Sequence, residues 1–99
     1  MDTILYVTAN FRIKKEKILE AIQLMKSLTE ATHKESGCKD YYYLQNPDNT
    51  CEFTSFEIWA TSDAEAKHWQ TQHITDALAQ LPDLLETAPE IKKRIPIQS

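Results

Sequence analysis

The sequence of 99 residues contains a single glycine, Gly37. Phosphate-binding loops and dinucleotide fingerprints each need several glycines, so the common nucleotide-binding motifs are excluded. Only two cysteines are present, and the sequence has neither the paired-cysteine spacing of zinc sites nor a His-Glu-x-x-His motif. We therefore expect no metal ion and no organic cofactor.

The sequence also lacks an excess of positive charge and any long apolar run. Eleven Lys and Arg residues against fifteen Asp and Glu residues give a net charge of −4, whereas nucleic-acid binding needs a basic face. No apolar run approaches the roughly 18 residues of a membrane span, and the amino terminus does not resemble a signal peptide. These features predict a cytoplasmic protein, with reduced cysteines, that binds neither nucleic acid nor membrane.

Hydrophobic periodicity predicts one domain, residues 1–99, with the order β-α-β-β-α-β. The predicted strands are 3–13, 39–45, 52–60 and 90–97, and the predicted helices are 15–35 and 63–80. This order places both helices on one face of a four-stranded antiparallel sheet, which is the α+β ferredoxin-like arrangement. Because the other face of the sheet still carries apolar residues, we expect a homodimer that packs through it.

Several local signals refine these boundaries. Gly37 follows the first helix and is expected to supply a left-handed turn there. Ser62, with Glu65 three residues later, has the pattern of a capping box at the start of the second helix. This helix is expected to bend or break near residues 71–72, and Pro82 is expected to begin a separate short turn.

The join between the third strand and the second helix concentrates chemically useful side chains. Glu57 lies inside a predicted strand, where carboxylates are uncommon, so it is either a functional acid or a rim carboxylate paired with a lysine. Two of the three histidines, His68 and His73, lie on the helix that follows, and histidine is the residue type most often used for proton transfer. On a continuous helix they would diverge by about 140° and could not share a metal ion, which leaves them as ordinary surface histidines or as proton-transfer groups.

Glu57-Ile-Trp59, a capped alanine-rich helix start and His68-Trp-Gln-Thr-Gln-His73 together resemble the signature of the antibiotic biosynthesis monooxygenase family. Weaker matches extend the resemblance over essentially the whole chain. They are Val7-x-Ala9-x-Phe11, Glu35-x-Gly37-Cys38-x-x-Tyr41 and Pro89-Glu90-Ile91. One departure is Gln72, where many relatives have proline.

The resemblance implies a dimeric α/β barrel of two ferredoxin-like subunits, each with a pocket between its sheet and its helices. It also implies a cofactor-independent monooxygenase that oxidises a small hydroxylated aromatic or quinol with molecular oxygen. Such chemistry suits the missing motifs, because an electron-rich phenolate can itself reduce oxygen. The protein then needs only to deprotonate the substrate, hold it and exclude water.

The same resemblance assigns roles to particular residues. His73 would be the base or the substrate-orienting group, and His68 would be its partner at the mouth of the pocket. Glu57 would orient a histidine or accept a substrate hydroxyl, and Asn10 would donate to a developing oxyanion or to bound oxygen. The aromatic walls would come from Trp59, Trp69 and Tyr41.

Three other functions stay open from the sequence. A related branch isomerises a phosphorylated quorum-signal sugar and carries a basic Lys-Lys-Arg near the carboxyl end, where this chain has residues 92–94. Another branch degrades haem, but Ala79 stands where its axial ligand would be expected. The third possibility is a dimeric ligand-binding module whose pocket performs no chemistry.

Overall fold

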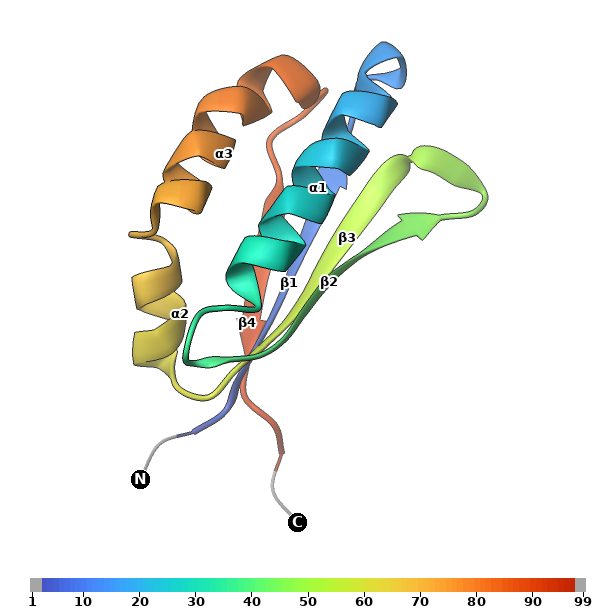
Figure 1. Ribbon diagram of the computed structural model, residues 1–99. Coiled ribbons are helices and arrows are strands. Elements are labelled where there is room, and N and C mark those ends of the chain that lie inside the picture. Colours follow the sequence, from blue (N-terminus) through green and yellow to red (C-terminus); the bar gives the residue numbers. More distant parts are fainter. Residues whose placement is uncertain (1–2, 98–99) are drawn as a thin grey trace.

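The chain folds into a four-stranded antiparallel sheet that is covered on one face by helices (Figure 1). The computed structural model describes residues 3–97. The elements in chain order are β1 (Leu5–Arg12), a 3-10 turn η1 (Lys15–Lys17), α1 (Ile18–Thr32), β2 (Cys38–Asn46), β3 (Asn49–Trp59), α2 (Ser62–His68), α3 (Gln72–Leu84) and β4 (Glu90–Arg94). The strand order β2-β3-β1-β4 confirms the predicted ferredoxin-like α+β fold.

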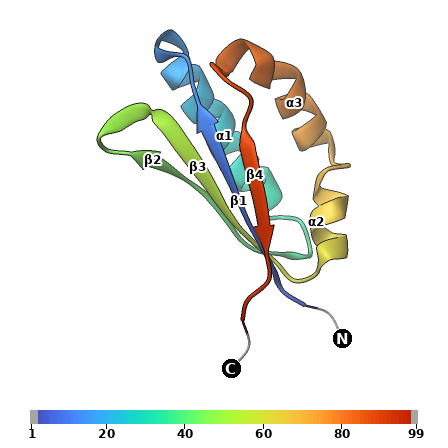
Figure 2. The same cartoon turned by 180° about the vertical axis from the view of Figure 1, so that it is seen from behind.

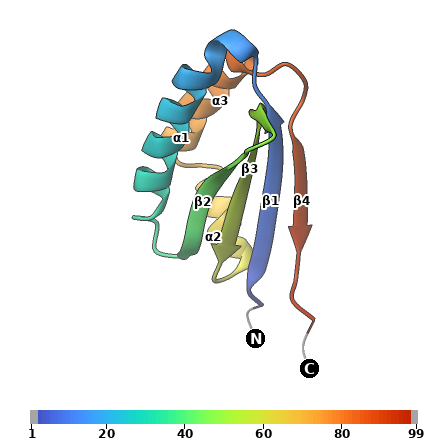
Figure 3. The ribbon, with the colours of Figure 1, turned by 90° about the vertical axis from the view of Figure 1, so that its right-hand side faces the viewer.

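The two faces of the sheet differ because successive side chains of a strand point to opposite sides. Val7 and Ala9 of β1 are buried beneath the helices, whereas Tyr6 and Thr8, which alternate with them, are only half-buried. Figure 2 shows the sheet from the side that carries no helix, and Figure 3 shows the helices gathered on the other side. The helix-covered face therefore contains the hydrophobic core.

Two groups of buried side chains make up this core. One group joins the middle of the sheet to α1 and α3, and it consists of Val7, Leu28, Tyr41, Trp59, Ile74 and Ala77. The other closes the far end of the same layer, and it consists of Ile13, Ala21, Met25, Phe53 and Leu84. A continuous apolar layer thus separates the sheet from the helices.

The predicted break in the second helix is confirmed. α2 ends at His68 and α3 begins at Gln72. Thr71 lies between them in extended conformation, and its hydroxyl accepts a hydrogen bond from the backbone N–H of Ile74 at 3.4 Å. The same hydroxyl donates to the carbonyl oxygen of His68 at 2.7 Å. One threonine thus caps the start of α3 and contacts the end of α2, which fixes the angle between them.

Two local predictions at turns are wrong. The start of α2 is capped by Thr61, whose hydroxyl accepts from the backbone N–H of Ala64 at 3.0 Å, so Ser62 is not the cap. The side chain of Glu65 instead accepts a hydrogen bond from Trp69. Gly37 does not adopt a left-handed conformation. Glycine is needed there because a Cβ would lie 2.1 Å from the Cβ of Ala64, so the turn after α1 packs directly against α2.

Several predicted boundaries also differ. Pro82 lies inside the last turn of α3 and does not begin a separate turn. The last strand ends at Arg94, and Ile95 and Ile97 beyond it are exposed. The first helix is shorter than predicted, because residues 15–17 form a 3-10 turn. Among residues 3–97, no helix is both long enough and apolar enough to span a membrane.

Candidate active site

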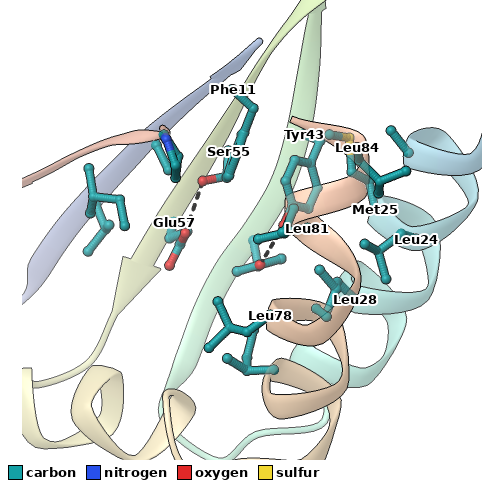
Figure 4. A pocket seen from close by; sticks show the side chains of 18 of the residues that line it. Phe11, Leu24, Met25, Leu28, Tyr43, Ser55, Glu57, Leu78, Leu81 and Leu84 are labelled. Carbon is teal, nitrogen blue, oxygen red and sulfur yellow. Dashed lines mark hydrogen bonds between the residues drawn. The ribbon is translucent and has the colours of Figure 1, made fainter. Parts of the chain in front are cut away.

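A cavity of about 150 Å³ lies between the helix-covered face of the sheet and helices α1 and α3 (Figure 4). Its walls are mostly apolar, and the side chains that supply them include Val7, Phe11, Leu24, Met25, Leu28, Leu81 and Leu84. An apolar cavity of about this volume can hold one benzene ring. The size therefore favours a single-ring ligand over a polycyclic one.

Glu57 is the acidic group of this cavity. It lies near the end of β3, opposite Val7 of β1 and Tyr41 of β2, and only 7% of its surface is exposed. Its carboxylate accepts a hydrogen bond from the Ser55 hydroxyl at 3.0 Å (Figure 4). It also accepts one from the Trp59 indole N–H at 3.0 Å. Burial raises the pKa of Glu57 above its ordinary value of 4.5, although the two hydrogen bonds and nearby His68 oppose this rise. The cavity thus favours the neutral acid.

Two tyrosines complete the polar part of the cavity. The hydroxyls of Tyr41 and Tyr43, two residues apart on β2, lie 2.8 Å from each other. Burial raises the pKa of both phenols above 10. The two hydroxyls are therefore neutral hydrogen-bonding groups near pH 7, and neither is available as a base.

His68 is the cavity group suited to accept a proton. Its side chain is 3% exposed, and its ring centroid lies 4.7 Å from that of Trp59 and 5.5 Å from that of Tyr41. Nδ1 lies 2.7 Å from Oε2 of Glu35, in the turn between α1 and β2. Within residues 3–97, Nε2 has no hydrogen-bond partner, and His68 lines the cavity. If Nδ1 carries the proton that Glu35 accepts, Nε2 is a free acceptor.

His73 is bound to the same carboxylate oxygen. Its Nε2 lies 2.7 Å from Oε2 of Glu35, and its ring centroid lies 5.9 Å from that of His68. However, His73 lies on an outer groove between α1 and α3 and is not among the residues that line the cavity. The expected pairing of the two histidines is therefore seen, but their positions relative to the cavity are the reverse of those predicted.

The other predicted site residues divide into two groups. Tyr41 and Trp69 do line the cavity. Trp59 is completely buried behind it and acts as a hydrogen-bond donor to Glu57, so it is not a wall. Asn10 lies on the opposite face of the sheet, where its side-chain oxygen accepts from the Thr54 hydroxyl at 2.7 Å. Strand alternation thus excludes Asn10 from this cavity.

Glu35 is the site residue that the sequence interpretation missed. It appears in the sequence only as a member of the motif that precedes Gly37, and nothing in that motif shows what it binds. In the structure it holds His68 and His73 from a different part of the chain. The signal that could have found it is the glycine, because the close contact of Gly37 with Ala64 brings Glu35 to α2.

The arrangement also changes the prediction about metal ions. The two histidines would diverge only on a continuous helix, and the helix breaks between His68 and His73. Nitrogen atoms of both histidines and a carboxylate oxygen of Glu35 consequently all lie within 4.8 Å of one another. These three residues are close enough together to hold one ion.

The basic residues near the carboxyl end do not contribute to the cavity. Lys93 forms an ion pair with Glu65 at 3.0 Å, and Lys92 forms one with Glu90 at 3.3 Å. None of residues 92–94 lines the cavity. The cavity therefore lacks the cations with which proteins usually bind a phosphate group.

Comparison with known proteins identifies the family. Residues 4–80 match the family model described as antibiotic biosynthesis monooxygenase. The chain belongs to this family. It is 31% identical over 91 residues to the uncharacterized protein sll1783 of Synechocystis sp., a match that covers 92% of this chain and 62% of that relative. The chain thus spans about three fifths of the length of this relative.

Solved structures of the antibiotic biosynthesis monooxygenase family and of similar proteins have the same fold. A conserved protein from Methanosarcina mazei Go1 is 32% identical with a TM-score of 0.89, and the match covers 93% of this chain and 91% of that one. A structure named antibiotic biosynthesis monooxygenase is 23% identical with a TM-score of 0.90, and the match covers 95% of this chain and 99% of that one. The second likeness shows the fold alone.

Proposed function

We propose that the protein is a cofactor-independent monooxygenase that oxidises a small, single-ring hydroxylated aromatic or quinol with molecular oxygen. Family membership supports the reaction class. One observation carries the finer assignment: His68 is bound at Nδ1 by Glu35 and lines an apolar cavity that is the size of one aromatic ring. His68, and not His73, is then the base.

The first step is proton transfer from a substrate hydroxyl to Nε2 of His68. Glu35 accepts the Nδ1–H, which keeps the ring in the required tautomer and stabilises the imidazolium that forms. Such general-base catalysis contributes about 10²- to 10⁴-fold to a rate. The phenolate is the electron donor, so one oxygen atom enters the ring and the other leaves as water, while the quinol becomes a hydroxyquinone.

The remaining polar groups of the cavity can orient the substrate. Glu57, in its neutral form, can donate to a second substrate oxygen, and the tyrosine hydroxyls lie on the neighbouring strand. The apolar walls exclude water from the phenolate, which limits its reprotonation. The absence of lysine and arginine from the lining disfavours a phosphorylated sugar as the substrate.

The test is oxygen uptake by the chelator-treated protein with a panel of dihydroxybenzenes and with the larger dihydroxynaphthalenes. We expect uptake with one or more of the single-ring compounds, weak uptake with the two-ring compounds, and formation of one water per oxygen molecule consumed. Ligand binding without oxygen uptake across the panel would instead support a non-catalytic module. Conversion of a substrate without oxygen would support an isomerase, and either result would contradict the proposal.

We also propose that two copies associate through the open face of the sheet. Tyr6, Tyr42 and Phe56 form an aromatic cluster there, with ring centroids 5.5 Å apart for Tyr42 and Phe56 and 6.4 Å apart for Tyr6 and Phe56. These rings are only half-buried in the single chain. Phe56→Glu should convert a dimer into a monomer in sedimentation equilibrium, with Leu19→Glu on exposed α1 as the control. A wild-type monomer would contradict this proposal.

A further inference from the structure

We propose that Glu35, His68 and His73 form a binding site for one divalent transition-metal ion, with Zn²⁺ as the best fit, and that this ion silences the site. The binding part stands on the geometry of these three residues alone. The silencing part rests on the function proposed above, because it concerns His68 as the base. The two parts are tested separately below.

The three donor atoms come from three segments that converge. Glu35 lies in the turn after α1, His68 is the last residue of α2, and His73 lies in the first turn of α3. Nδ1 of His68 and Nε2 of His73 each lie 2.7 Å from Oε2 of Glu35. Two ligands bound to zinc at about 2.1 Å are roughly 3.4 Å apart at the tetrahedral angle. The two nitrogen–oxygen distances therefore have to lengthen by only a fraction of an ångström, and the two nitrogens, which lie within 4.8 Å of each other, have to come to about 3.4 Å apart.

The chemistry of the donors selects the ion. Two imidazole nitrogens and one carboxylate oxygen suit Zn²⁺ and Co²⁺, whereas Ca²⁺ and Mg²⁺ require mainly oxygen ligands. Three protein ligands leave a fourth tetrahedral position, which a water molecule can fill. The donor set thus specifies a transition-metal ion and leaves one position open.

An ion can reach these residues from the surface. The side chain of His73 is 24% exposed and that of Glu35 is 14% exposed. His73 also lines the outer groove between α1 and α3. Entry by this route does not require the aromatic cavity to be empty.

The backbone around the three residues is held in place without an ion. Thr71 fixes the break between α2 and α3. The contact of Gly37 with Ala64 holds the turn that carries Glu35 against α2. Ligands held in this way lose little freedom when an ion binds, which favours affinity.

Occupation changes His68 from an acceptor into a donor. A metal ion takes the lone pair of Nδ1, so the single proton of the neutral ring must move to Nε2. Nε2 can then no longer accept a proton from a substrate hydroxyl. An ion at Nδ1 also takes over the carboxylate of Glu35, which otherwise stabilises the imidazolium.

The binding part is tested by titration of chelator-treated protein with Zn²⁺ in a calorimeter, and with Co²⁺ by visible absorption. We expect one ion per chain, and at least about 10-fold weaker binding for Glu35→Gln, His68→Gln and His73→Gln. His33→Gln is the matched control, because His33 is the third histidine and its Nε2 is instead bonded to the carbonyl oxygen of Tyr41. Its affinity should stay within about twofold of wild type.

His73→Gln tests the ion site even if a variant of buried His68 folds poorly. Absence of binding to the wild type, or equal affinities for wild type and His73→Gln, would overturn the ion site. The second measurement is oxygen uptake with and without saturating Zn²⁺, where we expect loss of most of the activity. Undiminished uptake would overturn the silencing part. If the metal-free protein takes up no oxygen, the proposed function fails while the titration still decides the ion site.

Discussion

Glu57 and Glu35 are two carboxylates near His68 with opposite surroundings. Glu57 lies in a β-strand under the apolar layer and is bound by two neutral donors, a hydroxyl and an indole N–H. Glu35 lies in a turn, remains partly exposed and is bound by two imidazole nitrogens. Each imidazole can take a proton and form an ion pair with Glu35, whereas neither partner of Glu57 can become a cation.

This difference separates two tasks that one carboxylate could not perform together. Burial favours the acid form of Glu57 more strongly than its two hydrogen-bond donors favour the carboxylate, and the acid form can donate a hydrogen bond to a substrate. Two imidazoles beside Glu35 make it suited to supporting a proton on His68. Carboxylates in contrasting environments commonly take different roles in one site.

The largest effect of a change outside the cavity should follow from removing the charge of Glu35. Glu35→Gln keeps an oxygen that can accept from both histidines, so the positions of the rings should be retained. Without the negative charge the imidazolium of His68 is less stable, and we expect kcat to fall about 100-fold. KM should change little, because Glu35 does not line the cavity. Steady-state oxygen uptake measures both constants.

Glu57→Gln serves as the comparison for that experiment, because it also replaces a carboxylate by an amide. If Glu57→Gln lowered kcat as much as Glu35→Gln, or if Glu35→Gln were as active as wild type, the two carboxylates would not differ as described. A rise in KM for Glu57→Gln with a smaller change in kcat is the result expected from a substrate-orienting role.

The next effect concerns the turn that positions Glu35. Gly37→Ala places a Cβ 2.1 Å from the Cβ of Ala64, so the turn must move away from α2. Overpacking of this kind costs about 1–3 kcal/mol of folding stability, which denaturant unfolding can measure. Activity should fall as well, since Glu35 moves away from His68.

Ala64→Gly in the same background provides the control, because it removes the Cβ with which the new side chain clashes. This double variant should regain activity and part of the stability. Full activity of Gly37→Ala alone would show that the position of Glu35 is not important.

The smallest effect is the pH dependence of stability that comes from Glu57. Its pKa is higher in the folded than in the unfolded state, so above pH 4.5 the unfolded chain releases this proton more readily. The contribution of Glu57 to the free energy of unfolding is therefore largest at low pH and is lost as pH rises from 4.5 through its folded pKa.

Glu57→Gln removes this dependence and keeps groups that can bond to Ser55 and Trp59. We expect the free energy of unfolding, measured from denaturation curves between pH 4.5 and 8, to fall more steeply with pH for wild type than for the variant. Parallel pH dependences for the two proteins would contradict the assignment of a raised pKa to Glu57.

The fold could be predicted from the sequence because its main determinants are periodic. Alternation in β1 and the change to helical spacing in α1 are local patterns, and they give the order and type of the elements. The break near Thr71 was also visible, since threonine is a good helix cap. Gly37 was misread because its requirement comes from Ala64, which lies far away in the sequence.

The candidate site could be predicted only in part. Glu57 and His68 were found from their positions at the end of a strand and on the following helix. Which histidine faces the cavity depends on the angle between α2 and α3, which spacing alone does not give. Asn10 was assigned to the pocket because the pattern of β1 shows two faces without showing which one the helices cover.

Oxygen uptake by His68→Gln and His73→Gln, measured on metal-free protein with the best single-ring quinol, tests the central claim most directly. The proposal that His68 is the base predicts a loss of about 100-fold or more for His68→Gln. His73→Gln should retain activity within roughly 10-fold of wild type, since His73 lies outside the cavity. A larger loss for His73→Gln than for His68→Gln would contradict the claim.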